Sequence, residues 1–309
     1  MKKVFLYAGQ GAQRVGMGAD LYEKFPLFRD CLDSIELDFD FKGLMLDGPI
    51  EKLSLTEFTQ PCMAAFAYGV TELLKERGIT PAAAIGLSLG EYGALYSAGA
   101  FSGRDYVDIV RFRGKAMARS AEGVDCLMSA VLGADPAIVE ESCGAVTDSG
   151  IVHVANYNCP GQIVIGGDAA AVVKAEEELK KRGVKKIKRL NVSGPFHTSY
   201  MKEAGDALGE YLAKISLKDL QVPVISNVTG DYYGGSAREI GPLLVKQVQS
   251  ATRLESGLRR LLQDGHRSFV EIGPGKTMAS FLKKTAKDMG IEIEVSSIDT
   301  AEDFENASN

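Results

Sequence analysis

Short apolar runs alternate with segments of helical periodicity along most of this chain, and this alternation constrains the fold more than any other feature. Residues 4–8 form one such run, which ends at Gly9. A strand that is apolar on both faces belongs in a parallel sheet covered by helices on both sides. The sequence therefore predicts an α/β fold with a mostly parallel sheet. The expected strands are 4–8, 82–86, 222–228, 268–272 and 291–297, and the expected helices include 61–77, 89–98 and 102–120.

The middle of the chain follows a different order. We expect a strand at 127–133, a helix capped by Asp135, strands at 151–157 and 162–166, a helix capped by Asp168, and a strand at 184–192. Strand, helix, strand, strand, helix, strand is the order of the ferredoxin-like unit. The sequence thus predicts a discontinuous large domain, residues 1–125 and 195–309, that carries residues 126–194 as a ferredoxin-like insert. A cleft between the two parts would suit a binding site.

A glycine-flanked serine lies where the expected strand 82–86 meets the next helix. The pattern is G-x-S-x-G, with Ser88 between Gly86 and Gly90. A nucleophile elbow needs both glycines, because its tight turn brings backbone close to the positions two before and two after the serine. The elbow exposes the serine hydroxyl at a helix N-terminus and turns the N–H of Leu89 toward a developing oxyanion. A glycine-lined packing turn is the alternative interpretation.

A serine nucleophile needs a base, and the chain has three histidines. His153 lies within an expected strand and His266 follows a glycine in a polar turn, so both suit structural or solvated roles. His197 follows the break after strand 184–192, where a general base could lie, and a loop histidine without a role is the alternative. No acidic residue stands out as a third member. A serine–histidine dyad oriented by a carbonyl oxygen could suffice for a thioester, whose thiolate leaves easily.

Two polar residues fall on otherwise apolar helical stripes. Arg113 shares its stripe with Tyr106, Val110 and Met117. Because a guanidinium keeps its charge, it must meet an anion there, either a substrate carboxylate or an internal Asp or Glu. Gln247 falls on the apolar stripe of a later helix, where it has a hydrogen-bonding task or is simply buried and satisfied.

Composition and incomplete motifs argue against several classes of function. The net charge of −6 disfavours nucleic acid as the main partner. Five cysteines without a C-x-x-C spacing suit reduced thiols in a cytoplasmic protein better than disulfides or a zinc site. The N-terminal apolar run stops at Ala8, which is too short for a signal-peptide core, and no stretch approaches the length of a membrane span. The loops at Gly9 and Gly275 depart from the nucleotide-binding patterns, so we expect no metal and no nucleotide cofactor.

Six motifs follow one another along nearly the whole chain. They are Gly9-Gln10-Gly11-Ala12-Gln13, Gly86-Leu87-Ser88-Leu89-Gly90-Glu91-Tyr92, Arg113-Gly114-Lys115, Asn156-Tyr157-Asn158 with Pro160-Gly161-Gln162, Gly194-Pro195-Phe196-His197, and Glu271-Ile272-Gly273-Pro274-Gly275. Together they resemble the motifs of malonyl-CoA:acyl carrier protein transacylases. The resemblance implies an α/β-hydrolase-like domain with the ferredoxin-like insert. It also implies transfer of malonyl from coenzyme A to the phosphopantetheine thiol of acyl carrier protein, for fatty acid synthesis and without a cofactor.

The resemblance implies catalytic roles for five residues. It makes Ser88 the nucleophile that carries the acyl group in a two-step, ping-pong reaction, and His197 the general base. The backbone N–H groups of Gln10 and Leu89 would bind the oxyanion. Gln247 would orient His197 through its main-chain carbonyl.

Two further residues concern the substrate, and a third departs from the family. By the same resemblance, Arg113 would hold the malonyl carboxylate. Phe196 matches the bulky residue that malonyl-selective members carry before the histidine, where methylmalonyl-selective members have a smaller one. The chain departs from the family at Leu87, because most members have histidine directly before the nucleophile. The elbow geometry does not require a histidine there, so we expect activity to be kept.

Three other functions fit parts of the pattern. A serine esterase or thioesterase would use the same elbow, but an enzyme for neutral esters has no use for a buried Arg113. A carrier-protein-binding module with a vestigial site would not need Ser88, His197 and Arg113 together. A free-standing acyltransferase of a polyketide synthase keeps the chemistry and changes the pathway. We expect a cytoplasmic monomer that meets its carrier protein transiently.

The expected carrier protein is acidic, whereas this chain itself carries a net charge of −6, so docking would need a local basic patch. A basic run in the insert could supply that patch, or it could be a solvated face that balances nearby glutamates. The run consists of Lys180, Lys181, Arg182, Lys185, Lys186, Lys188 and Arg189.

Overall fold

Two sheets and their flanking helices form the part of the chain that the structure, a computed structural model, describes, which is residues 2–308. The larger part contains β1 (Lys2–Tyr7), β2 (Thr80–Gly86), β7 (Thr252–Arg253), β8 (Ser268–Ile272) and β9 (Glu294–Ile298). Its helices are α1 (Ala19–Lys24), α2 (Pro26–Asp33), α3 (Phe41–Asp47), α4 (Ile50–Leu53), α5 (Thr56–Glu76), α6 (Gly90–Ser97), α7 (Gly103–Ala121), η2 (Ser199–Met201), α10 (Lys202–Leu212), α11 (Ala237–Val248), α12 (Leu254–Gln263), α13 (Thr277–Asp288) and α14 (Ala301–Ser308). The smaller part contains β3 (Cys126–Leu132), α8 (Pro136–Gly144), η1 (Thr147–Ser149), β4 (Val152–Cys159), β5 (Gln162–Asp168), α9 (Ala169–Lys181) and β6 (Lys186–Arg189).

Strand β1 lies inside the sheet of the larger part, whose order over residues 2–308 is β2-β1-β8-β9 with parallel neighbours. Successive side chains of a strand point to opposite faces. Accordingly Phe5 and Tyr7 belong to the core that includes α5 and α7, whereas Val4 and Leu6 belong to the core that includes α12 and α13. The sheet is thus covered on both faces, as the unbroken apolar run predicted, and the α/β fold class is confirmed.

The strand register brings three loops to one edge of this sheet. Tyr7 on β1 is aligned with Gly86 on β2 and with Ile272 on β8. Because the three strands are parallel, the segments that follow them leave the sheet at the same end. Gln10 and Ser88, which are far apart in the sequence, therefore lie at the same edge.

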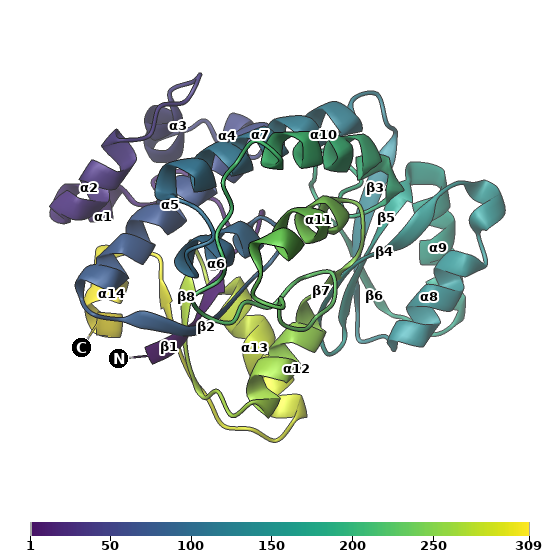
Figure 1. Ribbon diagram of the computed structural model, residues 1–309. Helices are drawn as coiled ribbons and strands as arrows, with labels where there is room; N and C mark the ends of the chain where they lie inside the picture. The colour runs from purple at the N-terminus through teal and green to yellow at the C-terminus, as the bar shows by residue number, and fades with distance from the viewer. Residues whose placement is uncertain (1, 309) are drawn as a thin grey trace.

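The second sheet is mostly antiparallel and has the order β6-β3-β5-β4-β7 within the described chain. Helices α8 and α9 pack against it through a separate apolar cluster, and Figure 1 shows this teal unit to one side of the parallel sheet. Its elements follow the predicted β-α-β-β-α-β order. Strand β7, which comes from residues outside 126–194, pairs in parallel with β4 and was not predicted. We propose residues 126–194 as the smaller domain, with 1–125 and 195–309 as the larger one.

Two predicted elements of the larger part differ from the structure. The helix expected at 61–77 is α5, which begins at Thr56 and contains Pro61 in its interior. Burial on most of its surface outweighs the hydrogen bond that proline cannot donate. The strand expected at 222–228 is reduced to two isolated bridges, Ala84 with Val224 and Ile225 with Tyr232. Pro223 lies within it and cannot donate to a ladder.

Two predictions in the smaller part also need correction. The strand expected at 184–192 is the shorter β6, which lies at the edge of its sheet. Asp168 occupies the N-cap position of α9, but its carboxylate does not cap the helix. It instead accepts hydrogen bonds from the N–H of Ile151, just before β4, and from the hydroxyl of Tyr200 in η2. Within residues 2–308, helices that are both long and apolar enough to span a bilayer are absent.

Candidate active site

Ser88 lies in a sharp turn between β2 and α6, and the two flanking glycines make this turn possible. A Cβ at Gly86 would lie 2.0 Å from the carbonyl carbon of Gly90. A Cβ at Gly90 would lie 2.3 Å from the carbonyl oxygen of Tyr7. Ser88 itself has φ of +54°, in the left-handed region that non-glycine residues rarely adopt. The pattern G-x-S-x-G therefore reflects close backbone contacts, and the turn presents the hydroxyl above the end of the sheet.

His197 contacts this hydroxyl from the loop after β6. Its Nε2 lies 2.8 Å from Ser88 Oγ, and its Nδ1 lies 2.9 Å from the main-chain oxygen of Gln247. A carbonyl oxygen can only accept, so Nδ1 carries the proton and Nε2 is the acceptor for the serine. Burial and, to a smaller extent, the positive charge of Arg113 together lower the pKa of His197 to about 4. The imidazole is therefore neutral near pH 7, as a general base must be.

Arg113 on α7 is 1% exposed and points its guanidinium at the serine. Its Nη2 donates to Ser88 Oγ at 2.9 Å and to Gln247 Oε1 at 3.1 Å, and its Nη1 donates to Gln60 Oε1 at 2.6 Å. It also lies over the ring of Tyr92, with 5.3 Å from Cζ to the centroid. Among residues 2–308 it forms no ion pair, and its Nε is buried without a hydrogen-bond partner. No carboxylate within residues 2–308 therefore forms an ion pair with the guanidinium. An anion in the cavity could pair with it.

Gln247 on α11 is also buried at 1% exposure and links several of these groups. Its Nε2 donates to the main-chain oxygen of Ser88 at 2.8 Å and to Glu91 Oε2 at 2.7 Å. Its main-chain oxygen accepts the hydrogen bond from His197 Nδ1, as described above. Gln247 is thus buried with both side-chain polar atoms hydrogen-bonded, which fits either interpretation that the sequence left open.

A cavity of about 270 Å³ opens beside the serine. Its lining combines polar groups around Ser88 with apolar side chains from both parts of the chain, and it includes Gln10, Leu87, Ser88, Arg113, Met117, Met128, Asn156, Asn158, Val164, Leu190, Val192, Phe196, His197, Thr277 and Phe281. The main-chain N–H groups of Gln10 and Leu89 have no protein acceptor within residues 2–308. They are therefore free to bind an oxyanion at this edge of the sheet.

Four residues that sequence reasoning did not single out belong to the site. Gln60 Oε1 accepts a hydrogen bond from Arg113, and Asn227 Oδ1 accepts one from the Ser88 N–H. Glu91 is fully buried on α6, and burial raises its pKa to about 7 despite three hydrogen-bond donors. Asn158 is 6% exposed, lines the cavity and has an Oδ1 without a partner. The one sequence signal for Glu91 is that it is an acidic residue in an otherwise apolar helix. Nothing in the sequence pattern distinguishes Asn227.

Known proteins resemble this chain over nearly its whole length. The acyl transferase domain family matches residues 4–306. The chain is 42% identical over 286 residues to the malonyl CoA-acyl carrier protein transacylase of Bacillus subtilis (strain 168), covering 92% of this chain and 90% of that protein. The solved malonyl-CoA:acyl carrier protein transacylase of Xanthomonas oryzae pv. oryzae is 39% identical, with a TM-score of 0.93 over 99% of this chain and 98% of that one. A malonyl-transacylase solved with its holo type II PKS acyl-carrier protein is 30% identical, with a TM-score of 0.94 over 99% of each chain.

Proposed function

This chain belongs to the acyl transferase domain family, and we propose that it transfers malonyl from malonyl-CoA to the phosphopantetheine thiol of acyl carrier protein, for fatty acid synthesis. The observation that carries the choice of acyl group is Arg113. A buried guanidinium without an ion pair donates to the nucleophile itself, at 2.9 Å. A carboxylated acyl group would satisfy this charge, whereas a neutral ester or thioester would leave it unpaired.

The first half-reaction loads Ser88. Its Oγ attacks the thioester carbonyl carbon while His197 Nε2 accepts the hydroxyl proton. The N–H groups of Gln10 and Leu89 bind the negative oxygen that develops. The carbon–sulfur bond then breaks, and coenzyme A leaves as the thiol with the proton that His197 held. Ser88 keeps the malonyl group as an ester.

The second half-reaction unloads Ser88 by the same groups in reverse. The sulfur of the phosphopantetheine thiol attacks the ester while His197 takes the thiol proton. As the ester bond breaks, His197 gives that proton to Ser88 Oγ. A thioester is consumed and a thioester is formed, so the exchange is nearly isoenergetic. We therefore assign no ATP, metal or cofactor to the reaction.

Arg113 also couples substrate recognition to the reactivity of the serine. In the absence of substrate its Nη2 donates to Ser88 Oγ, which occupies an oxygen lone pair. A malonyl carboxylate is a stronger acceptor than a hydroxyl or an amide, so it would draw Nη2 away from Oγ. The lone pair would then be free for attack. Phe196, which lines the cavity beside His197, limits the room for a branch on the acyl group.

Mass spectrometry of the intact protein tests this function. The protein should gain one malonyl group after incubation with malonyl-CoA and lose it when a holo acyl carrier protein is added. Methylmalonyl-CoA and acetyl-CoA should each react more slowly, because Phe196 opposes the branch and acetyl lacks the carboxylate. Two results would contradict the proposal. The protein could stay unmodified with malonyl-CoA, or its malonyl ester could be hydrolysed by water faster than it is transferred to the carrier protein.

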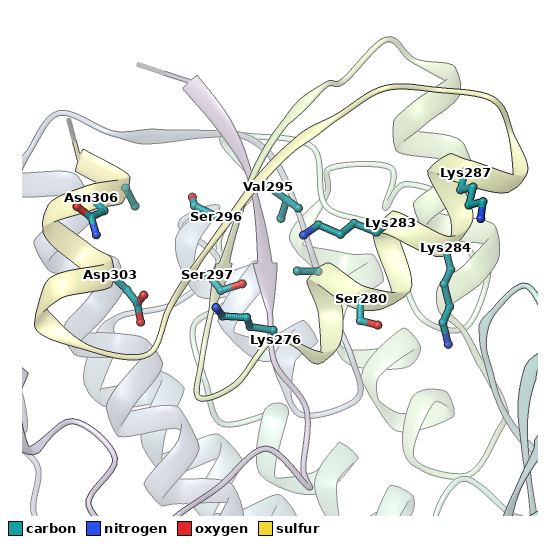
Figure 2. A pocket seen from close by; sticks show the side chains of 12 residues that line it. Lys276, Ser280, Lys283, Lys284, Lys287, Val295, Ser296, Ser297, Asp303 and Asn306 are labelled. Atoms are coloured by element: carbon teal, nitrogen blue, oxygen red, sulfur yellow. The ribbon is translucent and has the colours of Figure 1, made fainter.

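We propose that acyl carrier protein docks transiently on the basic run of the smaller part. Lys185, Lys186 and Lys188 are exposed and form no ion pair within residues 2–308. Among the other members, Lys181, Arg182 and Arg189 pair with Glu178, Glu141 and Glu176, whereas Lys180 is exposed and also forms no ion pair within residues 2–308. A second lysine-rich surface is a cavity of about 600 Å³ beside α13, lined by Lys276, Lys283, Lys284 and Lys287 (Figure 2).

Reversing Lys185, Lys186 and Lys188 to glutamate should slow transfer to the carrier protein about tenfold or more at low salt. Acylation by malonyl-CoA should stay unchanged, since rim charges chiefly alter association rate and its salt dependence. Stopped-flow measurement of each half-reaction at low and high salt separates the two steps. Equal reversals at Lys2, Lys214 and Lys218, which are exposed elsewhere, are the control. Unchanged carrier-protein rates in the first variant would reject this surface and direct the same experiment to the lysines of Figure 2.

We also propose that the protein acts as a monomer in the cytoplasm. Support comes from its cysteines, all of which are free, and four of which are buried. Reduced thiols of this kind are typical of a reducing compartment.

A further inference from the structure

Both main-chain polar groups of Ser88 are held by side-chain amides from distant parts of the chain. Asn227 Oδ1 accepts the Ser88 N–H at 2.7 Å, and Gln247 Nε2 donates to the Ser88 carbonyl oxygen at 2.8 Å. Asn227 Nδ2 also donates to the carbonyl oxygen of Gly86 at 2.7 Å. The Asn227 amide therefore binds two backbone groups of the elbow, one on each side of Leu87.

Glu91 Oε2 joins these two amides. It accepts the main-chain N–H of Asn227 at 3.1 Å and Gln247 Nε2 at 2.7 Å, while Glu91 Oε1 accepts the hydroxyl of Tyr233. Asn227 and Gln247 are each 1% exposed, and Glu91 is fully buried. In such surroundings unpaired polar groups are costly, so these hydrogen bonds are expected to persist.

The geometry needs such support because two residues in the dyad have positive φ. Ser88 has φ of +54° and His197 has φ of +61°. Residues held in this region stay there only when their surroundings impose it. Gln247 supplies the carbonyl oxygen that holds His197, and it shares Glu91 Oε2 with the residue that holds Ser88.

We propose that Asn227 and Glu91 form a positioning pair, which holds the Ser88 elbow in register with the Gln247 carbonyl that orients His197. This inference rests on the proposed function, in which Ser88 is the nucleophile. Neither residue touches the reacting atoms. Asn227 acts on the nucleophile through its backbone, and Glu91 acts by keeping Asn227 and Gln247 at a fixed separation.

Asn227→Ala tests the pair most directly, because it removes the amide and keeps the main-chain N–H that Glu91 accepts. Misplacing a nucleophile by about 1 Å costs on the order of 10²-fold in rate. We therefore expect the kcat of Ser88 acylation to fall about 100-fold, with KM for malonyl-CoA within about threefold of wild type. The loss should be equal for malonyl-CoA and acetyl-CoA, because Asn227 does not contact the arginine that selects the carboxylate.

Glu91 and Tyr233 provide the matched comparison. Glu91→Leu should lower kcat as Asn227→Ala does, and Glu91→Gln should recover most of it, because one amide oxygen can still accept from Asn227 and Gln247. The double variant with Asn227→Ala and Glu91→Leu should lose no more than the worse single variant, since both act through Ser88. Tyr233→Phe removes a hydrogen bond to the same carboxylate away from the serine, so it should lower Tm while kcat stays at the wild-type value.

Three results would overturn the positioning role. They are a wild-type kcat for Asn227→Ala, a rise in its KM for malonyl-CoA as large as its fall in kcat, or a loss of kcat in Tyr233→Phe equal to that in Asn227→Ala. If Glu91→Leu does not fold, Asn227→Ala against Tyr233→Phe still decides. The rate at which phenylmethanesulfonyl fluoride modifies Ser88, followed by intact mass, repeats the comparison without any acyl-CoA. A wild-type protein that reacts with this probe but not with malonyl-CoA would refute the proposed function alone, and the variants would still test the pair.

Discussion

Replacing Ser88 with alanine should abolish the acyl-enzyme and lower malonyl transfer by about 10⁴-fold or more. The hydroxyl oxygen is hydrogen-bonded to both the base and the arginine, because it lies 2.8 Å from His197 Nε2 and 2.9 Å from Arg113 Nη2. Without it the base has no proton to accept and the substrate carbonyl meets no nucleophile. The remaining oxyanion donors cannot form a covalent intermediate, so the loss should be in kcat.

Peptide mapping after incubation with malonyl-CoA measures this effect. The wild-type peptide that contains Ser88 should gain one malonyl group, and the variant should gain none. Ser97→Ala is a suitable control, because Ser97 lies at the end of α6, the helix that follows Ser88, and its hydroxyl donates to the carbonyl oxygen of Ala94, outside the site. An active Ser88→Ala protein, or a malonyl group on another residue, would refute the mechanism.

Replacing Arg113 with alanine should lower malonyl transfer by about 30- to 150-fold, which corresponds to losing a buried charge-assisted pair worth about 2–3 kcal/mol. Acetyl transfer should hold or rise. Acetyl has no carboxylate to draw the guanidinium away, so in the wild-type protein Nη2 keeps its hydrogen bond to Ser88 Oγ during attack. Removing Arg113 removes that restraint and also the nearby positive charge that lowers the pKa of His197.

The ratio of kcat/KM for malonyl-CoA to that for acetyl-CoA is the measurement. Arg119→Ala is the control, because Arg119 lies on the same helix and is exposed. Arg113→Lys should be intermediate, since an ammonium keeps the charge without the two-pronged geometry. Parallel losses for both substrates in Arg113→Ala would mean that the arginine is structural, and the assignment of malonyl would fail with it.

Local signals in the sequence were sufficient for several elements and for the central residues of the site. The bounds of β8 match the prediction, and the helix expected at 102–120 is α7, whose first N–H groups are capped by the Ser102 hydroxyl accepting the Asp105 N–H. Ser88 could be singled out because a tight turn demands glycine at positions two residues away. Arg113 could be singled out because a charge on an apolar helical stripe is visible in residue spacing. These signals depend on neighbours within one or two turns of chain.

The tertiary structure decided everything that depends on pairing between distant segments. Asn227 holds the Ser88 N–H across 139 residues, and its segment was expected to be a regular strand. Strand β7 joins β4 from outside the insert, and whether Arg113 meets a carboxylate or neutral amides could not be read from its own helix. A periodic pattern reports which face of an element is buried, because burial follows from geometry repeated along the chain. It does not report which polar group lies opposite, because that partner is set by how the folded elements pack.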